Sequence, residues 1–234
     1  MSLLASFADV CRNVECGKWI AVALSFLVEG YTEISPLLEI ITPSVFVSLY
    51  ELDDTSGVIS KCLVQTLFTL ISISDLFAEC LASREMISVL RKALDQCKVS
   101  GDEQVYYNVS YVLFKLSDST PIVRNAISCE LCAEILTELL TKPACYEIAT
   151  ATVNNFYNDR AVRKSYALPK IGEALVRIID SKPVLDCLFN CVSCIYVLSK
   201  IPETRDWLTQ SPTNADQTLL AHANSDDAKL KANV

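Results

Sequence analysis

The sequence has little of what catalytic and nucleotide-binding sites require. It contains five glycines and one histidine. No two of the glycines are close enough to form a GxGxxG or P-loop phosphate cradle, so we expect no nucleotide site. The histidine, His222, lies in a weakly apolar stretch near the end, where we expect it to be solvated. Because a serine or cysteine nucleophile usually needs a positioned base, the sequence predicts a protein that is not an enzyme.

Long hydrophobic runs and an excess of basic residues are also lacking. The apolar run from Trp19 to Val28 is about half of the roughly 20 residues that a membrane-spanning helix needs. The first residues lack the basic stretch of a signal peptide, and Asp9 interrupts a short apolar run. A net charge of −8 disfavours a general nucleic-acid binder. We therefore expect no membrane insertion, no nucleic-acid partner, and a location in the cytoplasm or the nucleus.

Glycine-rich hairpins and sustained strand alternation are absent as well, which favours an all-helical fold. Hydrophobic residues make up 51% of the chain and charged residues 21%, which supplies a large core and excludes wholesale disorder. The eleven cysteines follow no signal peptide, so we expect them to be reduced. For the same reason we interpret the Asn108-Val109-Ser110 sequon as a chance match.

An apolar pair, with its members three positions apart, recurs along the chain. The pairs are Leu24/Leu27, Leu67/Leu70, Leu113/Leu116, Val153/Phe156 and Ile195/Leu198. The intervals between successive pairs are 43, 46, 40 and 42 residues. Helical units with a period of roughly 40 to 47 residues are typical of armadillo and HEAT arrays, whereas tetratricopeptide repeats have a period of about 34. The period therefore predicts a stack of helical repeats.

The clearest single unit runs from Ala149 to Leu175. In it a helix end and a polar turn precede a short helix and a third, amphipathic helix that begins at Pro169. This unit resembles the armadillo repeat, with the HEAT repeat as the alternative, and the resemblance covers about Trp19 to Leu220. It implies an all-α fold, a right-handed α-solenoid of about five armadillo-like three-helix repeats.

Turns and helix-start signals give the repeat boundaries. We predict a single array over residues 1–222 and a flexible tail over residues 223–234. Within the array we expect a cap at 1–17 and repeats at about 18–52, 58–95, 103–141, 143–181 and 183–222. We interpret the polar segment Gln96–Glu103 as the longest linker between repeats.

In the armadillo family the third helices line a concave groove for extended peptides or partner helices, so the resemblance implies a scaffold or adaptor. The predicted partner-binding groove consists of outward positions on the third helices and one asparagine at the end of a second helix. These residues are Arg91, Glu134, Glu138, Asn155, Lys170, Glu173 and Arg177, with Ser88 beside Arg91. The charged residues would set the polarity and register of a partner, and Asn155 would hydrogen-bond its backbone.

The chain lacks the side-chain pair that one well-known branch of the family uses. Import receptors of the importin-alpha type, which this fold resembles, hold basic peptides with a tryptophan and an asparagine four residues later. Here Trp19 and Trp207 are followed at that spacing by Ala23 and Ser211. The sequence therefore disfavours an import receptor.

Charge is distributed unevenly along the chain. Residues 1–60 hold eight acidic and two basic side chains, a balance of −6, whereas residues 143–182 hold six basic and four acidic ones, a balance of +2. One interpretation is ordinary solvated surface charge. The other is a basic patch in the fourth repeat that meets an acidic segment of a partner.

Two Cys-x-x-Cys pairs raise the alternative of a zinc site. Cys129 and Cys132 form one pair, and Cys191 and Cys194 the other, preceded by Cys187. The last three recur at four and three residues, so they share an apolar helical face on which cysteine behaves as a small hydrophobe. A whole repeat separates the two pairs, whereas zinc needs its sulfurs about 2.3 Å away. We therefore predict core cysteines and no cofactor.

The leading hypothesis is a non-enzymatic protein-binding scaffold or adaptor whose partner is another protein, held as a peptide segment or a folded domain. Three alternatives stay open. The chain could be an armadillo-type co-chaperone of an ATP-driven heat-shock chaperone, a structural subunit of a larger cytoskeletal assembly, or a thiol or zinc protein.

Overall fold

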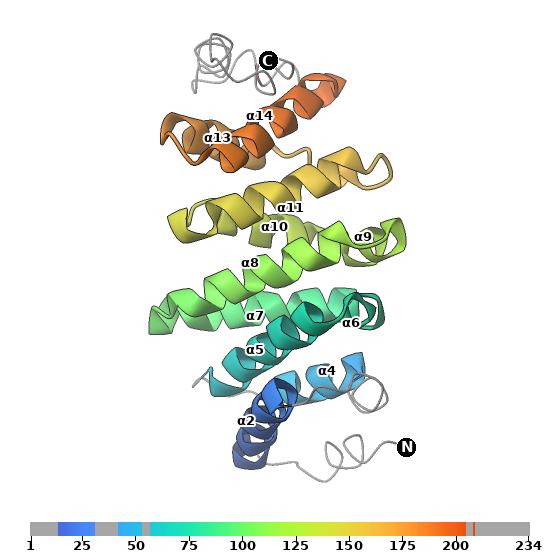
Figure 1. Cartoon of the computed structure of the whole chain (residues 1–234), viewed down its shortest axis with the longest axis vertical. Helices are drawn as coiled ribbons and strands as arrows, with labels where there is room; N and C mark the ends of the chain where they lie inside the picture. Colours follow the sequence, from blue (N-terminus) through green and yellow to red (C-terminus); the bar gives the residue numbers. More distant parts are fainter. Residues whose placement is uncertain (1–13, 31–41, 53–56, 205–207, 209–234) are drawn as a thin grey trace. The chain divides into compact units, whose positions relative to one another are not determined.

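A computed structural model describes residues 14–30, 42–52, 57–204 and 208 of the chain (Figure 1). All regular secondary structure in these ranges is helical. The chain divides into two compact units, Met1–Ile127 and Ser128–Val234, which we call unit one and unit two. Most of the predicted cap, the predicted tail, Trp207 and His222 lie outside the described residues.

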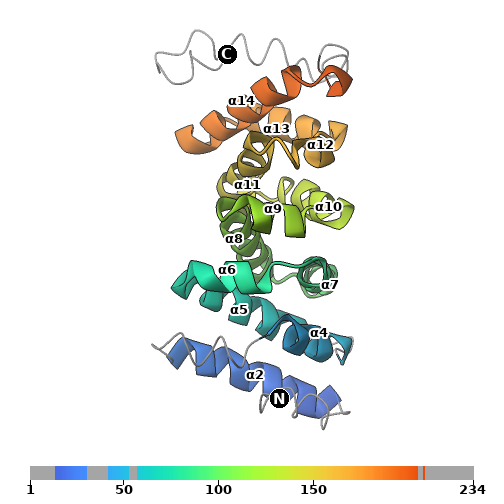
Figure 2. The same cartoon turned by 90° about the vertical axis from the view of Figure 1, so that its right-hand side faces the viewer.

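Unit one combines long helices with shorter ones. Its helices are α2 (Val14–Gly30), α4 (Pro43–Glu51), α5 (Val58–Ile73), α6 (Asp75–Leu81), α7 (Arg84–Ser100), α8 (Glu103–Asp118) and α9 (Pro121–Ile127). The long helices α2, α5 and α8 follow one another, each packed on the next. The third helices of the first two predicted repeats, α4 and α7, pack together (Figure 2).

The helix boundaries in unit one follow from local hydrogen bonds. Ser74, Ser83 and Asp102 each accept a hydrogen bond from a backbone N–H in the first turn of α6, α7 and α8 respectively. Such caps satisfy N–H groups that have no partner within the helix. Gly101 ends α7 with a positive φ of 71°, a conformation that glycine adopts without steric cost.

The prediction that Gln96–Glu103 is a linker is wrong for most of this segment. Helix α7 continues through Ser100, and α8 begins at Glu103, so two residues connect the helices. Cys97 extends the buried stripe of α7 by one turn, and its thiol donates to the Asp102 carbonyl across 2.7 Å. The polar residues around Cys97 therefore form the exposed side of a helix.

Side-chain amides connect the long helices α5 and α8. Asn108 Nδ2 donates to Gln65 Oε1 across 2.7 Å, and Gln104 Nε2 donates to Asn108 Oδ1 across 2.9 Å. Asn108 is 4% exposed, so its amide is closed to glycosylation in the folded chain. This burial agrees with the interpretation of the sequon as a chance match.

Unit two also combines longer helices with short ones. Its elements are α10 (Glu130–Leu139), the 3-10 turn η1 (Pro143–Cys145), α11 (Tyr146–Asn158), α12 (Arg163–Tyr166), α13 (Pro169–Asp180) and α14 (Leu185–Ser199). The long helices α11 and α14 pack on each other, and the third helix α13 packs on α10 and α14. Helix α13 begins at Pro169, as predicted.

An aromatic cluster holds the short helix α12 against α11. The rings of Phe156 and Tyr166 stack with centroids 4.0 Å apart, and the Tyr157 hydroxyl donates to the Tyr166 carbonyl across 2.8 Å. All three side chains are fully buried, and burial raises the pKa of each tyrosine well above the usual tyrosine range. The cluster fixes the turn that leads into α13.

Candidate protein-binding face

The exposed side of α13 carries three of the predicted groove residues. Lys170, Glu173 and Arg177 recur at spacings of three and four, opposite a buried stripe that includes Ile171 and Leu175. Lys170 and Arg177 are exposed, and neither forms an ion pair with another described residue. Arg177 Nε instead donates to the backbone carbonyl of Glu173 across 3.3 Å. Two cationic groups therefore remain available to a partner on one helix face.

Helix α10 lies beside α13 and presents acidic residues. Glu134 is exposed and Glu138 is half-buried, one turn apart on the side of α10 opposite its buried residues. The backbone carbonyl of Glu138 accepts the Thr141 hydroxyl across 2.7 Å, which closes the helix end. Because α10 packs on α13, the acidic pair and the basic pair lie on two neighbouring third helices of unit two.

Asn155 has a different position from the other predicted residues. It lies near the end of α11, the long helix that packs on α14, and it is half-buried. Its neighbour Asn154 accepts from Asn158 Nδ2 and donates to Asn190 Oδ1, each across 3.3 Å. These amides join α11 to α14 as Gln65 and Asn108 join α5 to α8.

In unit one, Arg91 is engaged within its own helix. Its guanidinium forms an ion pair with Asp95 one turn later, with Nε 3.1 Å from Oδ1. Lys98 Nζ lies 3.2 Å from the same oxygen. The hydrogen bond from Arg91 lowers the pKa of the Asp95 carboxyl, with a smaller contribution from Lys98. The Ser88 hydroxyl, in turn, donates to the Arg84 carbonyl.

The sequence analysis missed a contact that connects α7 to α4. Lys92 Nζ donates to the Tyr50 carbonyl across 3.0 Å and lies 4.1 Å from the centroid of the Tyr50 ring. The two residues are 42 positions apart, close to one repeat period. A search for complementary side chains one period apart would have found this contact.

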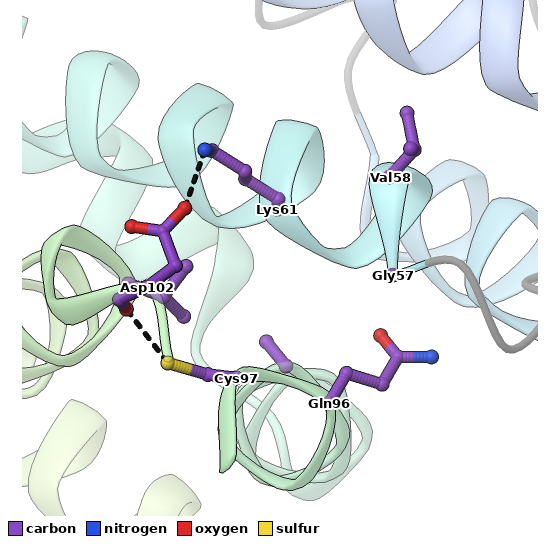
Figure 3. A pocket seen from close by; sticks show the side chains of 8 residues that line it. Gly57, Val58, Lys61, Gln96, Cys97 and Asp102 are labelled. Atoms are coloured by element: carbon purple, nitrogen blue, oxygen red, sulfur yellow. Dashed lines mark hydrogen bonds and ion pairs between the residues drawn. The ribbon is translucent and has the colours of Figure 1, made fainter. Parts of the chain in front are cut away.

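A pocket of about 230 Å³ lies where α5, α7 and α8 meet (Figure 3). Its lining includes Gly57, Lys61, Gln96, Cys97 and Asp102. Lys61 and Asp102 form an ion pair across it, which raises the pKa of the lysine and lowers that of the aspartate. The two charged side chains that line the pocket, Lys61 and Asp102, therefore pair with each other.

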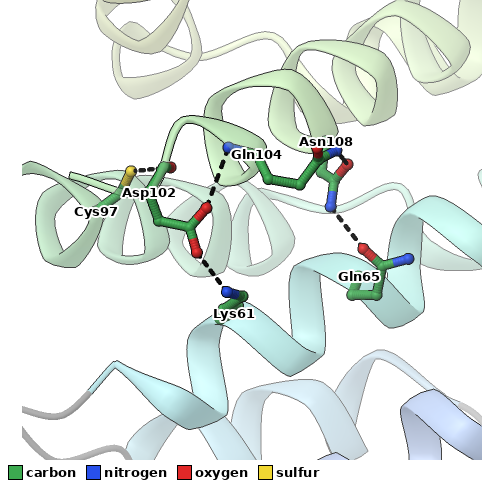
Figure 4. A network of polar contacts seen from close by, with 6 residues as sticks. All are labelled: Lys61, Gln65, Cys97, Asp102, Gln104 and Asn108. Atoms are coloured by element: carbon green, nitrogen blue, oxygen red, sulfur yellow. Dashed lines mark hydrogen bonds and ion pairs between the residues drawn. The ribbon is translucent and has the colours of Figure 1, made fainter. Parts of the chain in front are cut away.

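The same ion pair belongs to a polar network along α5 and α8 (Figure 4). Asp102 accepts from Lys61 and from the backbone N–H of Gln104, whose side chain leads on to Asn108 and Gln65. The network joins the start of α8 to the first half of α5. Its geometry indicates a role in fixing the register of the two helices.

The cysteines of unit two are packed in its core, except Cys129, which is half-buried. Cys132, Cys187, Cys191 and Cys194 are buried, and the Thr150 hydroxyl donates to Cys187 Sγ across 3.6 Å. Hydrogen bonds from Cys191 and then from Thr150 lower the pKa of Cys187 to about 7, whereas burial raises the pKa of Cys132 to about 12. Among the described residues no three His, Cys, Asp or Glu side chains are grouped to hold a metal ion. Metal analysis of the purified protein tests the zinc alternative.

None of the helices in the described ranges is both long enough and apolar enough to cross a membrane.

No family model matches the sequence, and neither does any curated protein. Solved structures do match. A designed armadillo repeat protein is 19% identical with a TM-score of 0.67, over 92% of this chain and 89% of that one. A second designed armadillo repeat protein, in complex with the peptide (KR)4, is 17% identical with a TM-score of 0.68, over 99% and 96%. The chain has an armadillo-like helical repeat fold.

An engineered protein matches as well, at 14% identity and a TM-score of 0.66, over 100% of this chain and 96% of that one. With these neighbours, the all-α solenoid predicted from the period is confirmed as the fold class. In the armadillo-like fold, α7, α10 and α13 are the third helices of successive predicted repeats. At such low identities the likeness establishes the fold alone, so the binding role of these helices rests on their own side chains.

Proposed function

We propose that this chain is a non-enzymatic protein-binding scaffold of the cytoplasm or the nucleus, which holds an extended segment of another protein along α10 and α13. The observation that carries the proposal is the pair of exposed cations Lys170 and Arg177, which form no ion pair with a described residue. Their helix, α13, packs on α10, which carries Glu134 and Glu138. The armadillo-like fold and the peptide bound to one structural neighbour support it.

The chemistry of the face favours a partner segment with acidic residues. Lys170 and Arg177 are about ten ångströms apart along the helix axis, since seven residues rise by roughly 1.5 Å each. An extended chain advances by about 3.3 Å per residue, so acidic side chains about three residues apart would reach both cations. Glu134 and Glu138 would then repel acidic residues of the partner segment and attract basic ones, which would fix the register of the segment along the two helices.

The experiment that tests this proposal starts with a display library of random peptides selected on the full chain. Calorimetry then measures the affinity of the selected peptides for three proteins: the wild type, Lys170→Glu/Arg177→Glu, and the control Arg160→Glu/Lys200→Glu. The control changes charge equally at two exposed positions outside α10 and α13.

We expect the selected peptides to be rich in Asp and Glu. The α13 variant should bind them about tenfold more weakly, a loss of about 1.4 kcal/mol. Its Tm should match that of the wild type, and the control variant should bind normally. A selection that yields no peptide, or equal affinity for all three proteins, would contradict the proposal.

A further inference from the structure

The first turn of α10 carries two cysteines in different environments. Cys129 is the N-cap residue, with an extended backbone (φ −152°, ψ 166°), and its carbonyl accepts from the backbone N–H of Ala133 across 3.2 Å, the first hydrogen bond of the helix. Cys132 lies three residues later, within the first turn. Cys129 is half-buried, whereas Cys132 is fully buried. One thiol of the pair is therefore accessible to a reagent in solution, and the other is shielded.

The spacing of these two cysteines suits a disulfide. Residues three apart on an α-helix have Cα atoms about 5 Å apart. Disulfides join Cα atoms that are roughly 4.4–6.8 Å apart. An N-cap side chain can also reach the first turn, where Cys132 lies. Because the Cys129 side chain makes no capping hydrogen bond, its sulfur is not held by the N–H groups of the helix.

A tyrosine hydroxyl without a partner lies beside this pair. Tyr166 belongs to α12, which packs on α10, and it is fully buried. Its hydroxyl has no hydrogen-bond partner in the part of the chain that the structure describes. Burial is the main cause of the raised pKa of this hydroxyl, and Cys132 is the next largest. Buried hydroxyls are nearly always hydrogen-bonded, so an unpaired one beside a thiol needs an explanation. A Cys132 thiolate would be a strong acceptor for it.

We propose that Cys129 and Cys132 form a reversible dithiol–disulfide site that exchanges with low-molecular-weight disulfides of the glutathione class. In the first step the Cys129 thiol loses its proton and its sulfur attacks one sulfur of glutathione disulfide, whose S–S bond breaks and releases one glutathione thiolate. In the second step the Cys132 thiol loses its proton and its sulfur attacks that of Cys129, which forms the internal disulfide and releases the second glutathione. The two protons end on the two glutathione thiolates, so two protein thiols are oxidised and one disulfide is reduced.

Burial sets the order of these steps. A dissolved disulfide can reach Cys129 but not Cys132, so Cys129 is the attacking residue and Cys132 the resolving one. Burial raises the pKa of Cys132 to about 12, and the Tyr166 hydroxyl opposes this rise. When glutathione reduces the internal disulfide, Cys132 leaves as a thiolate, to which Tyr166 donates a hydrogen bond. Tyr166 is thus a positioning residue, and the site is independent of the proposed binding face.

The second Cys-x-x-Cys pair of unit two supplies an internal control. Cys191 and Cys194 lie in the middle of α14, and both are fully buried. Neither offers a thiol that a dissolved disulfide can reach, so the pair should stay reduced in the folded chain. The same spacing therefore predicts opposite behaviour at the two places.

Thiol mapping of the full chain tests the proposal. The wild type, Cys129→Ser, Cys132→Ser and Tyr166→Phe are compared with the control Cys80→Ser, which removes an exposed cysteine of α6 in unit one. Each protein is equilibrated with mixtures of reduced glutathione and glutathione disulfide near neutral pH. Free thiols are then alkylated in denaturant after an acid quench, and peptide mass spectrometry locates internal disulfides and glutathione adducts. Circular dichroism and Tm report on the fold of each variant.

The wild type and Cys80→Ser should form a disulfide between Cys129 and Cys132, while Cys191 and Cys194 stay free. Cys132→Ser should instead accumulate a mixed disulfide of glutathione with Cys129, about tenfold above the wild-type level, because no thiol resolves it. Cys129→Ser should form neither product on α10, since the remaining thiol is buried.

Tyr166→Phe keeps the ring that stacks on Phe156 and the backbone carbonyl that accepts from Tyr157. It should keep the wild-type Tm but slow the reduction of the internal disulfide by glutathione about threefold, because the leaving thiolate loses its hydrogen bond. Equal reduction rates would remove Tyr166 from the site.

Two results from the wild type alone would overturn the proposal, even if the serine variants failed to fold. One is the absence of a Cys129–Cys132 disulfide at every glutathione ratio. The other is equal oxidation of Cys191 and Cys194, which would mean that the thiols react only after the chain unfolds.

Discussion

Helices α7 and α13 occupy equivalent places in two repeats, yet the basic residues on their predicted outward sides are arranged differently. On α7, Arg91 pairs with Asp95, and Lys92 contacts Tyr50 of α4. On α13, Lys170 and Arg177 form no ion pair with a described residue. The comparison shows that an outward position predicted from helical spacing does not by itself make a residue available to a partner.

The cause of the difference is the sequence one turn away. Arg91 has an acid at the fourth position after it, the spacing that brings side chains together on a helix. Four residues after Lys170 the chain has Ala174, which is buried. Arg177 follows Glu173 by four residues but donates to its backbone carbonyl. Of the residues predicted for the groove, those on α13 are therefore the best candidates for partner contact.

The largest effect should come from substitutions on the buried side of each helix, α7 and α13. Leu90→Ala in α7 and Leu175→Ala in α13 each remove a fully buried side chain, so each should lower the free energy of unfolding by about 2–5 kcal/mol. Lys170→Ala, on the exposed side of α13, should change it by less than about 0.5 kcal/mol. Urea unfolding measures all three, and a leucine variant as stable as Lys170→Ala would contradict the assigned helix orientation.

The next effect concerns the contact that holds α7 on α4. Lys92→Met keeps the apolar stem but removes the charged hydrogen bond to the Tyr50 carbonyl and the contact with its ring. We expect a loss of about 1–2 kcal/mol in unfolding free energy. Lys98→Met, on an exposed side chain of the same helix, serves as the control. Equal stability of the two variants would show that the Lys92 contact is not formed in solution.

A smaller effect, on peptide affinity, should distinguish Arg177 from Arg91. Arg177→Ala should weaken the selected peptide about fivefold, roughly 1 kcal/mol, and leave Tm unchanged. Arg91→Ala should leave the affinity unchanged, because its guanidinium pairs with Asp95 in the free protein. Calorimetry with the same peptide measures both variants. The reverse result, a loss only in Arg91→Ala, would move the binding face to unit one.

The smallest effect is the pH dependence of the Arg91–Asp95 pair. Since Arg91 lowers the pKa of Asp95 in the folded chain, the pair stabilises the fold above the unfolded carboxyl pKa of about 3.9 and loses this effect as the pH falls through the folded value. An exposed pair one turn apart contributes about 0.3–0.5 kcal/mol. Asp95→Asn should therefore lower Tm slightly at pH 7 and leave it unchanged near pH 2.

The sequence predicted the long helices well because burial repeats with a fixed period. Each member of the pairs Leu67/Leu70, Leu113/Leu116 and Ile195/Leu198 is buried, and together these residues mark α5, α8 and α14. The prediction failed at Gln96–Glu103, where one buried cysteine, Cys97, continues the stripe among polar residues. A linker and the exposed side of a helix have similar compositions, so composition alone could not separate them.

The candidate face was predicted in part. Helical spacing correctly placed Lys170 and Arg177 on the exposed side of α13. It did not predict that Arg91 is engaged by Asp95, although the two are one turn apart, or that Lys92 contacts Tyr50. The second contact depends on which side chains of neighbouring repeats meet, and this is set by the packing of α4 on α7.

The central claim, that a partner segment lies along α10 and α13, is tested most directly by photo-crosslinking. A benzoylphenylalanine is placed at position 170 or 177 and, as controls, at 160 or 200, and each protein is irradiated with the selected peptide. We predict crosslinks from positions 170 and 177 and none from the controls, with mass spectrometry locating them near acidic peptide residues. Crosslinks from 160 or 200, with none from α13, would contradict the account.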